Sequence, residues 1–104
     1  MADGPAIPLD PQFVIKTVAD CYGQSVADLF SLRRWHPLPD ARRVLYALVH
    51  EQCRVSWGQT AVLTGRSRRS ASAVAEIAGE ANPHALDVVR CRLVDNGQLR
   101  LDGI

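Results

Sequence analysis

Three observations predict an all-α fold of about six helices. Apolar residues recur at positions i, i+4 and i+7, which is the spacing of one helix face. Serine or aspartate precedes several of these segments, and glycine or proline follows them, as at helix ends. The 104 residues, 47% of them hydrophobic, suffice for one domain with one core. We expect a flexible lead at 1–10, a helical domain at 11–96 and a tail at 97–104.

The first predicted helix covers residues 11–22. Asp10 is the expected N-cap, and Pro11 stands at the first helical position, where its missing N–H is tolerated. Gly23 is expected to end the helix. Its apolar stripe consists of Val14, Val18 and Cys21.

A short second helix is predicted for residues 26–32. Ser25 is its expected N-cap, and Asp28 lies at the end of the helix that favours negative charge. A basic loop, 33–37, follows, and Pro37 prevents the helix from continuing through it.

The longest predicted helix starts at Pro39 or Asp40 and ends near Arg54. Its first turn carries Arg42 and Arg43, although acidic residues are favoured at that end. Basic residues there indicate an anionic partner nearby. One face of this helix carries Val44, Leu45, Leu48, Val49 and Gln52, and another carries Tyr46 and His50.

Two further helices are predicted as a helix-turn-helix. Ser56 is the expected cap of a helix over 57–64, and Gly65 closes it. Ser67 is the expected cap of the next helix, roughly 68–78. Two helices joined by a tight glycine-containing turn form this motif.

A sixth helix is expected to start at Asn82-Pro83 and to bury Leu86, Val89 and Leu93. Asn96-Gly97 has two interpretations: a helix C-cap, or the turn of a hairpin joining 91–95 to 98–102. The helical character of the rest of the chain favours the cap.

Charge is distributed unevenly along the chain. Residues 33–69 hold eight basic residues and two acids, a net charge of +6, and the rest of the chain carries −5. A basic face on an otherwise acidic domain is the charge pattern of a nucleic-acid-binding protein. The alternative is a solvated surface with an uneven charge distribution.

The second helix of a helix-turn-helix contacts DNA through its N-terminal residues. Those residues are Arg68, Arg69 and Ser70 here, and arginine can donate two hydrogen bonds to guanine O6 and N7. The serine hydroxyls suit phosphate oxygens. The alternative is a solvated loop. The expected DNA-binding residues are Arg33, Arg34, Arg42, Arg66, Ser67, Arg68, Arg69 and Ser70.

The order of these segments resembles the C-terminal DNA-binding domain of the bacterial replication initiator DnaA, over about residues 12–80. Residues 14–22 are similar to the family's I-x-x-x-V-A-x-x-Y, and residues 26–34 to its V-x-D-L-x-S-x-x-R. Arg42 matches the arginine that opens the family's long helix. Ala47, Leu48 and Glu51 fit the A-L-x-x-E that follows, and Ser56 matches a helix cap.

The chain departs from the family on the recognition helix. The family has G-R-D-H-T-T there, whereas either alignment of residues 66–70 lacks both the aspartate and the histidine. The resemblance implies DNA binding, and two alternatives stay open: a G-containing site or largely nonspecific binding. The sequence contains no P-loop motif, so it resembles the DNA-binding domain alone, without a nucleotide site.

We therefore expect a small protein that binds double-stranded DNA and regulates transcription or replication initiation. The alternative is a protein-interaction module of the same fold that modulates the initiator or its regulators. We expect no enzyme activity, catalytic residue, metal or cofactor, because no Cys/His or Ser/His/Asp constellation occurs. The absence of a signal sequence and of a membrane-length apolar run favours a cytoplasmic location, and the expected DNA binding implies association with the nucleoid.

Overall fold

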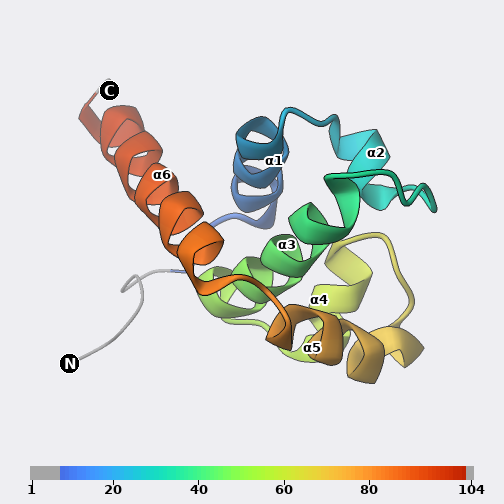
Figure 1. Ribbon diagram of the computed structural model, residues 1–104. Coiled ribbons are helices and arrows are strands. Elements are labelled where there is room, and N and C mark those ends of the chain that lie inside the picture. Colours follow the sequence, from blue (N-terminus) through green and yellow to red (C-terminus); the bar gives the residue numbers. More distant parts are fainter. Residues whose placement is uncertain (1–7, 103–104) are drawn as a thin grey trace.

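The computed structural model describes residues 8–102 and is all-helical, as predicted. The helices are α1 (Pro11–Tyr22), α2 (Val26–Phe30), α3 (Leu38–Cys53), α4 (Trp57–Leu63), α5 (Ala71–Gly79) and α6 (Pro83–Asp102), with a short 3-10 helix, η1 (Arg68–Ser70), before α5. Figure 1 shows α3 in the middle of the molecule, with α1 and α2 on one side, α4 and α5 on the other, and α6 across one end.

Local capping sets the start of four helices. The carboxylate of Asp10 accepts a hydrogen bond from the N–H of Gln12 at 3.0 Å, and Gly23 ends α1 in the left-handed conformation with φ of 64°. Three further caps use the side chains of Ser25, Ser56 and Asn82. Each cap satisfies N–H groups that have no partner inside the helix.

The core forms where α3 packs against α1 and α5. On the face of α3 predicted from helical spacing, Val44, Leu45, Leu48 and Val49 are buried, and Gln52 is half-buried. Val14 and Val18 meet them from α1, and Val74, Val89 and Leu93 complete the core from α5 and α6. Burial of each such side chain stabilises the fold by roughly 1.5–3 kcal/mol.

The structure corrects the prediction for the tail. Helix α6 continues through Asn96-Gly97 to Asp102, so these residues form neither a helix cap nor a hairpin turn. The boundary predicted after residue 96 is therefore wrong. Intrahelical hydrogen bonding outweighs the low helix propensity of one asparagine and one glycine, which together disfavour a helix by about 1–2 kcal/mol.

The described residues include only the last part of the predicted lead. Residues 1–7 lie outside the described part of the chain. Leu9 donates its backbone N–H to the Gln52 carbonyl at 2.9 Å, and its side chain packs against the core. These contacts join Leu9 to the end of α3 and to the core.

Smaller differences concern helix boundaries. The second helix ends at Phe30 rather than Leu32, and the Ser31 N–H bonds to the Asp28 carbonyl at 3.2 Å. The third begins at Leu38, one residue before the predicted start. The fifth predicted helix begins as η1, and the α-helix starts at Ala71. The side chain of Ser67 makes no capping hydrogen bond, contrary to its predicted role.

Candidate nucleic-acid interface

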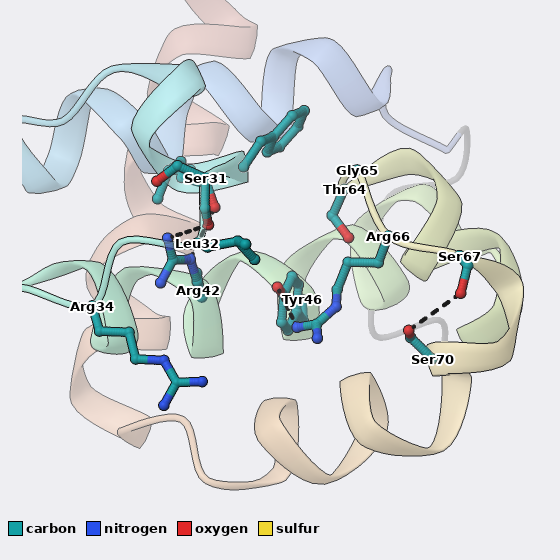
Figure 2. A pocket seen from close by; sticks show the side chains of 12 residues that line it. Ser31, Leu32, Arg34, Arg42, Tyr46, Thr64, Gly65, Arg66, Ser67 and Ser70 are labelled. Carbon is teal, nitrogen blue, oxygen red and sulfur yellow. Dashed lines mark hydrogen bonds between the residues drawn. The ribbon is translucent and has the colours of Figure 1, made fainter.

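A groove opens between the loop 31–37 and the turn 64–67. Two hollows of about 350 and 410 Å³ form it, and both are lined by Arg34, Arg42, Tyr46 and Arg66. Figure 2 shows these side chains over α3, with the loop at one wall and the turn at the other. We call this feature the basic groove. It joins the two basic segments that lie on either side of α3 in the sequence.

Arg42 holds the loop wall in place. Its guanidinium, half-buried at the start of α3, donates four hydrogen bonds of 2.6–3.0 Å. The acceptors are the backbone carbonyls of Asp28, Leu29, Ser31 and Arg33. Four of the five N–H donors are thus occupied. Arg42 lines the groove, but its hydrogen bonds are to the backbone of the protein itself.

Arg34 and Arg66 project from opposite walls of the basic groove. Arg34 is exposed, and no hydrogen bond or ion pair engages it among the side chains that the structure describes, those of residues 8–95. Arg66 donates to the Tyr46 hydroxyl at 3.3 Å. No acid among the described residues pairs with either guanidinium, so both remain available to an anion.

Arg33 lies at the outer side of the loop. It pairs with Asp28 at 3.2 Å, and its guanidinium carbon lies 4.7 Å above the Trp35 ring centroid. The ion pair neutralises part of its charge, and the cation–π contact covers one face of the tryptophan. Arg33 therefore contributes less free charge than Arg34.

The turn wall also carries the two predicted serines, Ser67 and Ser70. Gly65 adopts φ of 85°, which favours glycine, and a side chain there would meet the Phe30 ring at 3.3 Å. The hydroxyls of Ser67 and Ser70 lie 3.5 Å apart and line the groove (Figure 2).

Arg68 and Arg69 occupy η1 and are exposed. The aliphatic part of Arg68 packs close to Gly58, where an added Cβ would lie 3.2 Å from Arg68 Cγ. Neither arginine lines the groove. The structure therefore places five predicted residues in the groove and three outside it: Arg33, Arg68 and Arg69.

The groove residues that the sequence did not predict include Leu32, Tyr46 and Glu80. Helical spacing offered a signal for Tyr46, because it lies four residues after Arg42 on the same face of α3. Glu80 comes from the end of α5 and pairs with Arg43 at 3.8 Å, and Arg43 also pairs with Asp40 at 2.6 Å. This acidic side chain limits the positive charge at one edge of the groove.

The aromatic side chains differ in exposure. Tyr46 is buried, and Trp57 is half-buried and stacks on His50 with ring centroids 3.6 Å apart. Trp35, by contrast, is 51% exposed. Only Trp35 among these three therefore offers a large aromatic surface to a partner.

The cysteines are all free. Cys91 is exposed, whereas Cys53 is buried. Burial raises the pKa of the Cys53 thiol to about 11. Within the described residues, no cluster of three His, Cys, Asp or Glu side chains could hold a metal ion. None of the helices in that part is long and apolar enough to cross a membrane.

Comparisons with protein-family models, with curated proteins and with solved structures find no match to this chain.

Proposed function

We propose that the protein binds duplex DNA, with η1 and the start of α5 in the major groove and the basic groove over a sugar–phosphate strand. The observation that carries the proposal is the basic groove itself. Its two walls present the guanidinium groups of Arg34 and Arg66, which have no acidic partner among the described residues, and serine hydroxyls lie along one wall. Phosphate contacts of this kind position a protein on DNA.

The proposed DNA-binding residues have two roles: some contact phosphates, and others contact base edges. Arg34 and Arg66 contact phosphates, and the hydroxyls of Ser67 and Ser70 add neutral donors. Arg68 and Arg69 face the base edges, where arginine prefers guanine. Helix α4 packs against η1 and α5, which supports a helix-turn-helix arrangement.

The resemblance to the DnaA DNA-binding domain narrows the proposed biological role. A chain of this kind regulates transcription or replication initiation by occupying DNA. Since Asp and His are missing from residues 66–70, its site differs from the initiator's own site. The recognition residues favour guanine-containing sequences or binding with little sequence preference.

A fluorescence-anisotropy titration with duplex DNA at several salt concentrations tests this proposal. Four arginines are assigned to DNA contacts (Arg34, Arg66, Arg68 and Arg69), and none of them has an acidic partner within the described part of the chain, so the expected slope of log K against log salt is about −3.6. Arg34→Ala should reduce the magnitude of that slope by about 0.9. The matched control is Arg92→Ala, which removes an exposed arginine of α6 outside the groove. Equal effects of both variants, or no binding at low salt, would refute the proposed interface.

A second candidate function is protein binding, and the exposure of Trp35 favours it. Tryptophan and arginine are enriched among residues that dominate protein interfaces. The partner would be the replication initiator or one of its regulators. Trp35→Ala should then weaken binding to purified initiator while leaving the DNA titration unchanged.

A further inference from the structure

Leu32 is far more exposed than any other large apolar residue whose side chain is described. Its exposed fraction is 95%, and the next value is 59%, at Val94. Leu32 follows α2 in the loop 31–37 and lines the basic groove (Figure 2). An apolar side chain in this position contributes almost nothing to the core.

The backbone on both sides of Leu32 is fixed. Arg42 binds the Ser31 carbonyl at 2.7 Å and the Arg33 carbonyl at 2.6 Å, so one guanidinium holds the residues before and after Leu32. The Arg33 N–H also donates to the Ser31 hydroxyl at 3.2 Å. Leu32 therefore projects from an ordered loop, and less conformational entropy is lost when it is buried by a ligand.

The charges around Leu32 indicate what would cover it. Arg33 and Arg34 follow it directly, and the groove beside it carries the Arg66 guanidinium. A complementary ligand must offer an apolar slot between anionic groups. A step between stacked base pairs, with phosphates on either side, has that composition. Trp35 is a weaker candidate, because Arg33 already covers one face of its ring.

We propose that Leu32 inserts between adjacent base pairs of duplex DNA from the minor groove and bends the duplex. This inference rests on the proposed DNA binding and adds a second activity to it. Apolar wedges of this kind unstack one base step and kink DNA by roughly 20–90°. Pyrimidine–purine steps unstack most easily, so the bend occurs preferentially at TA and CA/TG steps.

The test measures binding and bending in the same samples. The full-length protein is titrated into a short duplex that contains a central TA step and carries a donor and an acceptor dye at its two ends. Anisotropy reports binding, and energy transfer reports the end-to-end distance. The expected result is an increase in energy transfer that saturates together with the anisotropy.

Leu32→Ser removes the wedge without touching the core or the arginines. It should abolish the change in energy transfer, keep the salt slope, and reduce affinity by less than about tenfold. The matched control is Val88→Ser, which changes an apolar residue of α6 that is 49% exposed and should preserve the bend. Binding without bending by the wild type, or bending by Leu32→Ser, overturns the wedge and leaves the proposed function intact. No binding at low salt overturns both.

Discussion

Replacing Arg42 with alanine should destabilise the protein more than replacing any other arginine whose side chain is described. The substitution removes four hydrogen bonds from a charged donor to backbone carbonyls. Each such bond contributes roughly 1.5–3 kcal/mol to stability when taken alone. The loop carbonyls are partly accessible to water after the change, and the four bonds share one side chain. We therefore expect a total loss of about 2–4 kcal/mol.

The matched control is Arg43→Ala. Arg43 is the next residue of α3 and is also half-buried, but its partners Asp40 and Glu80 are exposed carboxylates. Loss of such ion pairs costs about 0–1 kcal/mol. Arg42→Lys should fall between the two, because an ammonium group cannot reach carbonyls in four directions as a planar guanidinium does.

Urea unfolding followed by circular dichroism measures these differences, and hydrogen exchange locates them. Arg42→Ala should increase amide exchange in the loop 31–37 before it affects α3. If Arg42→Ala and Arg43→Ala differ by less than about 0.5 kcal/mol, the four hydrogen bonds do not hold the loop, and Arg42 is free to serve as a direct DNA contact.

Three further predictions concern stability, pH and thiol reactivity. Gly65→Ala should destabilise the fold by about 1–3 kcal/mol, because residue 65 has a positive φ and the added methyl group would contact an aromatic ring. Gly23→Ala should cost less, because its methyl group would meet no atom within 4 Å. Urea unfolding of both variants checks this order. The hydrogen bonds from Arg90 lower the pKa of Glu51 in the folded protein. The ion pair therefore stabilises the fold fully at pH values above the unfolded-state pKa of Glu51. This stabilisation is lost as the pH falls through the lower, folded-state pKa. The stability difference between wild type and Glu51→Gln should therefore be about 1 kcal/mol at neutral pH and vanish in acid, and a difference that grows in acid would contradict this assignment. The Cys53 thiol, with its pKa raised to about 11, should be the slowest of the three cysteines to react with iodoacetamide at pH 8, as peptide mass spectrometry would show.

The Arg42→Lys variant also tests the role of Arg42 in the proposed DNA binding. If Arg42 positions the loop without contacting phosphate, Arg42→Lys should weaken DNA binding less than Arg34→Ala does. A larger effect of Arg42→Lys would move the phosphate contact from Arg34 to Arg42 and change the proposed path of the DNA strand.

Local sequence determined most of the helices, because helix ends depend on residues within one turn of them. Asp10, Ser25 and Ser56 each accept a hydrogen bond from an N–H two or three residues ahead, so their effect is visible in the sequence alone. The burial of Val44, Leu45 and Leu48 follows from helical periodicity in the same way. The failure at Asn96-Gly97 has a related cause: two residues of low propensity were insufficient to end α6.

The tertiary structure decided what the basic residues do. Sequence placed Arg33, Arg34 and Arg42 together as cations, but their partners determine how much charge remains available. Arg33 meets an acid five residues away, Arg42 binds carbonyls 9–14 residues away, and Arg34 lines the groove without an ion pair in the described structure. Such contacts depend on how α2 and α3 pack, which spacing along the chain does not specify. Composition and order therefore determined that this protein is helical with one basic region, and packing decided which arginines hold the fold and which face the solvent.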